Sequence, residues 1–276
     1  MGFLLAAAHA SAGQTAELRV PDSAIAGNPA AIATSGSGKA TFYLSGPGTA
    51  VKEEVSLGQN IRLEARSLQG SGRYVAVLCS EVCHSAAFFV APGKPDSISF
   101  LLHPSRVPTG ENNAISGVAL PFDAFHNLVL APMTMTFQLG KAGSYSAPAH
   151  DGVAWFRSAS GKLAGMMQVT VSAADVSANR VVQAVAADPC NLRIKGERNA
   201  KGILVETEPV RDCAGNPVSD GTIVTFTATT VDGKSTVDAP IKHGVARAEI
   251  IANGQASISA ASGVVAGNQL VLGAKP

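Results

Sequence analysis

A turn motif that occurs twice at a fixed spacing is the feature that most constrains the fold of this chain. Asp123-Ala-Phe-His-Asn127 precedes a strand-like run containing Phe137, and Asp212-Cys-Ala-Gly-Asn216 precedes a similar run containing Phe226. The aspartates, asparagines and phenylalanines are each 89 residues apart (212 − 123), so nothing is inserted or lost between them. A fixed period of this kind indicates structural units stacked along a chain.

The residues of both copies suit a tight reversal of the chain. An aspartate side chain accepts hydrogen bonds from amides two residues ahead, and Gly215 followed by Asn216 can adopt positive φ. Because His126 stands where the second copy has Gly215, the first turn is expected either to differ or to hold His126 in the left-handed region. Phe137 and Phe226 share a repeat position and are expected to be core residues. The structural turn residues are therefore Asp123, Asn127, Asp212, Gly215 and Asn216.

Composition indicates an all-β protein without a nucleic-acid role. The 276 residues include 21 Lys and Arg against 20 Asp and Glu, so a formal charge of +1 gives no field to attract nucleic acid or an anionic membrane. Charged residues make up only 15% of the chain, and the abundance of small and β-branched residues suits short strands and tight turns. No segment has a sustained 3.6-residue apolar period, whereas short strand-like runs separated by turn residues favour sandwiches or barrels.

The order of these runs predicts three β-sandwich units. We expect a signal-like segment and tail at 1–16, a β-sandwich domain at 17–92, and immunoglobulin-like domains at 95–176 and 177–276. Pro92-Gly-Lys-Pro95 interrupts the strand pattern and is expected to be a short linker.

The N-terminal segment predicts export. An apolar run from Gly2 ends in small-x-small sites at Ala8-His-Ala10 and Ala10-Ser-Ala12, which is typical of a secretory signal, although no Lys or Arg precedes it. We interpret this as a start codon placed too late, with a loosely packed tail as the alternative. No later run approaches the ~20 apolar residues of a membrane span, so an extracytoplasmic location is expected at the cell surface, in the periplasm or in the medium.

Four cysteines fit an oxidising compartment, and we expect Cys79 to pair with Cys83 and Cys190 with Cys213. The alternative for the first pair is copper, because Cys79-Ser-Glu-Val-Cys83 is similar to the binuclear copper loop of cytochrome oxidase subunit two. That loop continues with a histidine and a methionine, where this chain has Ala87 and Val90. Two ligands of such a site are therefore missing, and a disulfide at a hairpin tip is favoured.

The repeated unit resembles bacterial immunoglobulin-like domains of the invasin and intimin group, over residues of about 95–276. The resemblance implies tandem immunoglobulin-like β-sandwiches, and its motif is nearly silent on function. The copy in the third unit matches at Asp212, Gly215, Asn216, Pro217, Val218, Gly221, Thr222, Val224, Phe226, Gly244 and Ala246. The copy in the second unit matches at Asp123, Asn127, Val129, Phe137, Asp151, Gly152, Ala154, Ala164 and Gly165.

No constellation in the sequence predicts catalysis. Asp123, His126, His150 and Asp151 could meet around a metal, but the third unit has Gly215 and His243 at two of these positions, so the set does not belong to the repeated turn. There is no Gly-x-Ser-x-Gly elbow and no clustered acid/base pair. Trp155, the single tryptophan, is interpreted as a packed sandwich residue rather than a sugar platform.

The sequence therefore predicts a non-enzymatic, exported structural or adhesion module without a cofactor or bound metal. Its partner is expected to be a protein or glycan at the cell surface, and the chain could also be a subunit of a larger assembly. A carbohydrate-binding or enzyme-accessory module is one alternative. A copper-dependent redox protein using Cys79 and Cys83 is the other.

Overall fold

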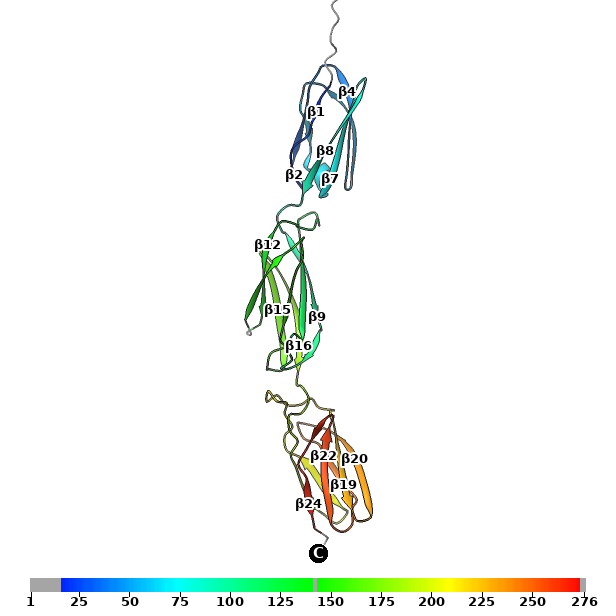
Figure 1. Cartoon of the computed structure of the whole chain (residues 1–276), viewed down its shortest axis with the longest axis vertical. Coiled ribbons are helices and arrows are strands. Elements are labelled where there is room, and N and C mark those ends of the chain that lie inside the picture. Colours follow the sequence, from blue (N-terminus) through cyan, green and yellow to red (C-terminus); the bar gives the residue numbers. More distant parts are fainter. Residues whose placement is uncertain (1–15, 141–142, 274–276) are drawn as a thin grey trace, which may run out of the picture.

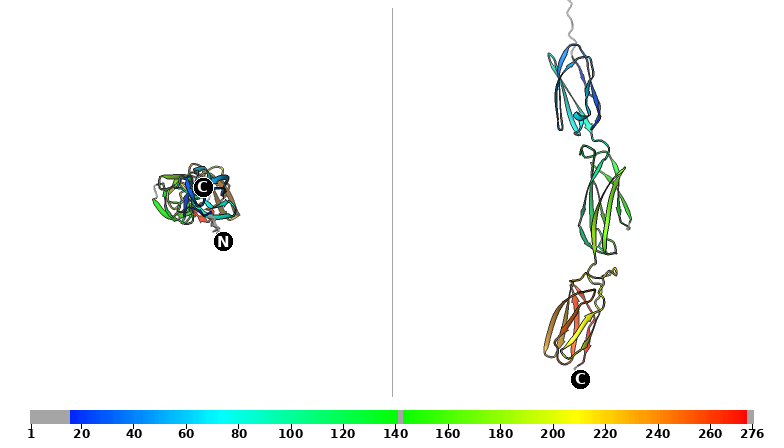
Figure 2. Two further views of the ribbon diagram at one scale, coloured as in Figure 1. Left: turned by 90° about the horizontal axis from the view of Figure 1, so that it is seen from above. Right: turned by 180° about the vertical axis from the view of Figure 1, so that it is seen from behind.

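The structure, a computed structural model, describes residues 16–140 and 143–273. The predicted signal-like segment lies outside these ranges, except for Ala16. Three β-sandwich domains follow one another along the long axis (Figure 1), and in the end-on view of Figure 2 they overlie one another within a small cross-section. The fold class predicted from the sequence, tandem immunoglobulin-like sandwiches, is confirmed.

Each domain packs a three-stranded sheet against a five-stranded one. In the first domain the smaller sheet has the order β1 (Leu18–Arg19), β3 (Ala30–Thr34), β6 (Ile61–Leu63). The larger sheet has the order β2 (Ala24–Ile25), β8 (Cys83–Ala91), β7 (Gly72–Cys79), β4 (Lys39–Gly46), β5 (Thr49–Ser56). A 3-10 helix, η1 (Ala65–Leu68), connects β6 to the loop before β7.

The second domain repeats this plan. Its smaller sheet has the order β14 (Ala154–Ser158), β11 (Ile115–Phe122), β9 (Ser97–His103). Its larger sheet has the order β10 (Arg106–Pro108), β16 (Val176–Val185), β15 (Gly165–Ala173), β12 (Met133–Leu139), β13 (Ser144–Ala149).

The third domain has β17 (Ile194–Arg198), β18 (Ile203–Thr207) and β21 (Arg247–Ile250) in its smaller sheet. The larger sheet has the order β20 (Gly233–Pro240), β19 (Ile223–Thr230), β22 (Ala256–Ser262), β23 (Val265–Ala266), and β24 (Leu270–Leu272) also pairs with β22. Within the described ranges no helix has the length and apolar character that a membrane crossing requires.

Alternating apolar residues build a separate core in each domain. In β11 every second residue is buried, as expected for a strand with one face on the core. Phe137 and Phe226 are both fully buried, which confirms the prediction drawn from their shared repeat position. In the second domain the Phe137 ring lies 4.5 Å from that of Phe156 and 6.0 Å from that of Phe100, centroid to centroid.

The boundary expected at 176/177 is wrong. β16 is paired with β15 from Ala173↔Val176 to Gly165↔Ala184, so it is the last strand of the second domain. The junction therefore follows Val185. The repeated turn fixes the spacing of the units but carries no information about where the final strand of a unit ends.

The interpretation of Trp155 as a packed residue is also wrong. Ala154 and Phe156 on the same strand are buried in the core, and alternation therefore turns the Trp155 side chain to the outer face, where 64% of it is exposed.

Candidate functional site: the junctions between domains

The two copies of the repeated turn have the same internal hydrogen bonds. Asp123 Oδ1 accepts hydrogen bonds from the amides of Phe125 and Asn127, both at 2.9 Å. Asp212 Oδ1 accepts them from Ala214 at 2.9 Å and from Asn216 at 2.8 Å. One carboxylate oxygen thus fixes each turn, as the sequence indicated.

His126 adopts the conformation of the glycine it replaces. Its φ is 62°, in the left-handed region, while that of Gly215 is 88°. The amides of His126 and Gly215 donate to the carbonyls of Asp123 and Asp212, each at 3.0 Å. Of the two possibilities left open for the first turn, the structure has the left-handed histidine.

At the first junction, the remaining polar atoms of the turn bind the preceding domain. Asp123 Oδ2 accepts a hydrogen bond from the linker amide of Gly93 at 2.8 Å. Asn127 Oδ1 accepts one from the Ser71 amide at 2.8 Å, and its Nδ2 donates to the Gln69 carbonyl at 2.7 Å. Asp123 and Asn127 form what we name the first Asp-Asn clasp, which joins the second domain to the loop that precedes β7.

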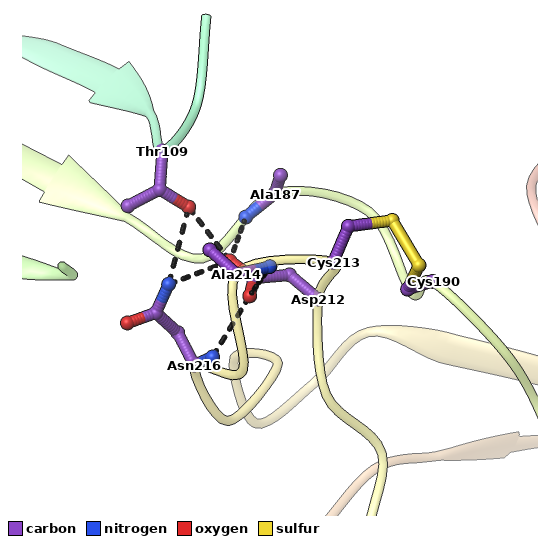
Figure 3. Close-up of a disulfide and its surroundings, with 7 residues drawn as sticks. All are labelled: Thr109, Ala187, Cys190, Asp212, Cys213, Ala214 and Asn216. Carbon is purple, nitrogen blue, oxygen red and sulfur yellow. Dashed lines mark hydrogen bonds between the residues drawn. A yellow bond between two sulfur atoms is a disulfide. The ribbon is translucent and has the colours of Figure 1, made fainter. Parts of the chain in front are cut away.

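The second junction repeats these contacts (Figure 3). Asp212 Oδ2 accepts hydrogen bonds from the linker amide of Ala187 at 3.1 Å and from the Thr109 hydroxyl at 2.6 Å. Asn216 Oδ1 accepts from the Ala164 amide at 2.9 Å, and Nδ2 donates to the Lys162 carbonyl at 2.7 Å. Asp212 and Asn216 form the second Asp-Asn clasp, which joins the third domain to the loop that precedes β15.

In both clasps the asparagine amide pairs with the main chain as another strand would. It accepts from one backbone amide and donates to the carbonyl two residues earlier, which is the pattern of a β-bridge. The receiving loops end in Gly72 and Gly165, whose φ values of 140° and 143° match closely. The turn that carries the clasp and the loop that receives it are therefore both repeated.

The two junctions differ in what reinforces the clasp. At the first, the Phe125 ring lies so close to Gly27 of the first domain that a Cβ on Gly27 would come within 2.1 Å of it. At the second, the Cys190–Cys213 disulfide ties the segment after the linker to the turn itself (Figure 3). Phe125 and Cys213 occupy two of the three positions at which the turns differ in sequence.

Hydrogen bonding keeps both clasp aspartates ionised. Burial alone raises the pKa of Asp212, but the hydrogen bonds from Thr109, Asn216 and the Ala187 amide outweigh it and bring the pKa from 3.8 to about 2. The pKa of Asp123 is also lowered, since donors from Asn127 and the amides of Gly93 and Phe125 outweigh its burial. Ionised acceptors make these the stronger kind of hydrogen bond.

Cys79 is bonded to Cys83 and Cys190 to Cys213, the pairing expected from the sequence. Cys79 and Cys83 face each other where β7 turns into β8. Neither sulfur is a thiolate in this form, and thiolates are what a copper site of that type requires.

The possible metal ligands of the second domain do not form one site. The Asp123 carboxylate is occupied by the clasp, and within the described ranges no three His, Cys, Asp or Glu side chains converge as a ligand set. His150 and Asp151 instead line a shallow surface depression together with Met133 and Pro148.

The interdomain partners of the clasps could not be read from the motif. Asn127 reaches residues 56 and 58 positions earlier, and Asn216 reaches residues 52 and 54 positions earlier. The signal that the sequence does contain is a glycine at the start of the strand after each receiving loop, Gly72 of β7 and Gly165 of β15.

Fold and junctions together define a class, a rod of tandem immunoglobulin-like domains. No protein-family model matches the sequence, and no curated protein matches it either. Among solved structures, the chain is similar to FdeC, an Escherichia coli adhesin, with a TM-score of 0.67 and 15% identity over 95% of this chain and 97% of that one.

Two further structures have the same arrangement at lower similarity. Yersinia pseudotuberculosis InvD gives a TM-score of 0.53 and 13% identity over 94% of this chain and 97% of that one. Invasin, a bacterial integrin-binding protein, gives 0.51 and 12% over 95% of this chain and 60% of that one. The resemblance to the invasin group is thus confirmed for the fold, and it extends over the first domain as well.

Proposed function

We propose that this chain is a non-enzymatic, exported adhesion or structural module. Its immunoglobulin-like domains form a rod that holds binding surfaces away from a point of attachment. Its partner is a protein or glycan at a cell surface, and the rod can also serve as a subunit of a larger assembly.

The observation that carries this proposal is the repetition of the clasp. Folding each domain does not require its turn to bind the preceding domain, yet both turns contribute buried aspartates to the junctions. Each junction has at least three interdomain or linker hydrogen bonds. Motion about a linker is the default for neighbouring domains, and such bonds stabilise one relative orientation against it.

The two disulfides support export, because disulfides persist in oxidising compartments and are rare in the cytosol. Two of the similar structures are of an adhesin and an integrin-binding protein, which supports adhesion as the role of the rod.

Small-angle X-ray scattering of the full chain tests the rod. Strands of up to ten residues make each domain about 34 Å long, so three in line give a maximum dimension of about 100 Å. A quadruple variant, Asp123→Ala, Asn127→Ala, Asp212→Ala and Asn216→Ala, is expected to give a broader distance distribution. A wild-type profile as broad as that of the variant would refute the rod.

Adhesion requires a separate measurement. Beads coated with the full chain are expected to attach to cultured cell monolayers more often than beads coated with the quadruple variant at equal density. If both kinds of bead attach only at the background level, an adhesive role is refuted.

A further inference from the structure

One row of side chains differs completely between two equivalent sheets. In the second domain, Leu101, Val118 and Trp155 are direct neighbours on β9, β11 and β14. In the third domain, the equivalent row on β17, β18 and β21 consists of Lys195, Glu206 and Arg247, in which the glutamate pairs with both cations. The same fold therefore supports either row, and the sandwich does not require apolar residues at this place.

The apolar row lies open on the surface. Leu101 is 63% exposed and Trp155 is 64% exposed, while Val118 between them is half-buried. Large aromatic side chains bury much surface when they are covered and dominate binding at interfaces. A fully formed strand presents Trp155 outward, and its neighbours on the strand are fixed in the core.

The residues that flank this row are polar or cationic, apart from Leu120. On one side, the next row consists of His103, Ser116 and Arg157, and Arg157 makes no ion pair with any residue the structure describes. On the other side, Ser99 lies beside Leu120. The outward positions of these three strands include no Asp or Glu within their bounds. The charge of this face is complementary to an anionic partner.

The size of the face favours a small partner. β9 and β11 have seven and eight residues, so three strands about 4.8 Å apart with a rise of about 3.4 Å per residue offer roughly 350 Å². A stable protein interface needs about 800 Å² from each partner. The apolar row itself spans about 10 Å between its outer strands, which is about two sugar rings.

We propose that the outer face of β9, β11 and β14 binds an acidic glycan. The indole of Trp155 supplies an apolar plane for the C–H face of a sugar ring, and the Arg157 guanidinium pairs with a carboxylate or sulfate of the same chain. The Ser99 hydroxyl supplies a hydrogen bond on one side of the row, and on the other the Ser116 hydroxyl, which donates to the His103 carbonyl at 3.4 Å, can accept one. This inference rests on the proposed function, since it names the class of ligand that the rod presents.

Trp155 is the single tryptophan of the chain, so its fluorescence reports on this face directly. The full chain is titrated with three oligosaccharides of equal length: a hyaluronan fragment with carboxylates, a heparin fragment with sulfates, and a neutral chitin fragment. At least one acidic fragment is expected to shift the emission saturably, and its affinity is expected to fall as salt rises. The two acidic arms distinguish carboxylate from sulfate recognition.

Three variants test the assignment. Arg157→Ser keeps the fluorophore and is expected to weaken binding about tenfold or more, the cost of a charge-assisted hydrogen bond. Leu101→Lys, Val118→Glu and Trp155→Arg together install the row of the third domain and are expected to abolish binding by calorimetry. Met166→Ala is the matched control, because this residue is 84% exposed on the other sheet of the same domain and should leave affinity unchanged.

The proposal is overturned by an unshifted emission with all three fragments, by equal affinity for the neutral fragment, or by an Arg157→Ser variant that binds as the wild type does. Chains that dimerise through Trp155 in light scattering, with the dimer lost in the triple variant, would assign the face to a second copy instead. If beads coated with the triple variant attach to cells as often as beads coated with the wild-type chain, the glycan site is refuted while the adhesive rod stands. If neither the wild-type beads nor the triple-variant beads attach to cells, the proposed function fails.

Discussion

Replacing Asn216 by alanine removes the strand-like half of the second clasp. The two shorter interdomain hydrogen bonds that are lost, to the Lys162 carbonyl and from the Ala164 amide, are each worth about 1 kcal/mol net, and a third, to the Thr109 hydroxyl, is long at 3.4 Å. A loss of about 2 kcal/mol reduces the ratio of docked to undocked junctions about 30-fold. Each domain keeps its own core and should remain folded.

Amide hydrogen exchange followed by NMR on the full chain measures this change at the site. The Ala164 amide donates a hydrogen bond to Asn216 Oδ1, so its protection against exchange is expected to fall about 30-fold in Asn216→Ala. The Ser71 amide donates a hydrogen bond to Asn127 at the first junction. It is the internal reference, and its protection against exchange should not change.

Asn268 provides the matched control. Its Oδ1 accepts a hydrogen bond from the Ile194 amide at 2.7 Å, so it contacts main chain in the same manner but within the third domain. Asn268→Ala should expose the Ile194 amide and leave Ala164 protected. If Ala164 exchanges equally slowly in Asn216→Ala and in the wild type, the clasp does not hold the junction and the reasoning is refuted.

Three further outcomes are expected. His126→Gly should stabilise the second domain and raise its melting temperature, because a left-handed histidine costs up to about 1 kcal/mol. Gly215→Ala should destabilise the third domain by a similar free energy and lower its melting temperature. A lower melting temperature for His126→Gly, or a higher one for Gly215→Ala, measured by calorimetry, would contradict the shared turn geometry. Because the pKa of docked Asp212, about 2, lies below its ordinary 3.8, the second clasp is stabilised above about pH 4 and weakens as pH falls towards 2; a scattering profile unchanged between pH 7 and pH 2 would count against it. Replacing Cys190 and Cys213 by serine should destabilise the third domain by about 3 kcal/mol, the value for a loop of 23 residues, and an unchanged thermal transition of that domain would show that the disulfide does not restrict its unfolded chain.

Local features of the junctions were predictable from the sequence, and distant ones were not. The bonds from Asp123 Oδ1 and Asp212 Oδ1 connect residues two and four positions apart, so residue type and spacing were sufficient to expect the turn. The other oxygen of each aspartate binds a linker amide 30 or 25 positions earlier. Such contacts depend on how the whole preceding domain ends, which no local pattern contains.

The two errors have separate physical origins. β16 carries no turn motif or repeat marker, so a boundary drawn from the order of strand-like runs cut off a strand that pairs with β15 from Val176 to Ala184. Trp155 was judged by residue type, although the alternation between buried Ala154 and Phe156 already turns it outward. Position in a strand decided its exposure, and hydrophobicity did not.

The difference between the junctions matters when the rod is pulled from its ends. The chain enters each domain at one end and leaves at the other, so tension applied along the long axis passes through both clasps (Figure 1). Hydrogen bonds act over short distances, and a small extension separates the clasp from its loop. At the second junction the Cys190–Cys213 bond keeps the start of the third domain fixed to the turn under load, so Asp212 stays within a few residues of the Ala187 amide. A covalent bond therefore holds this turn beside its linker, whereas at the first junction hydrogen bonds alone hold it, such as the one from the Asp96 amide to the Phe122 carbonyl at 2.8 Å.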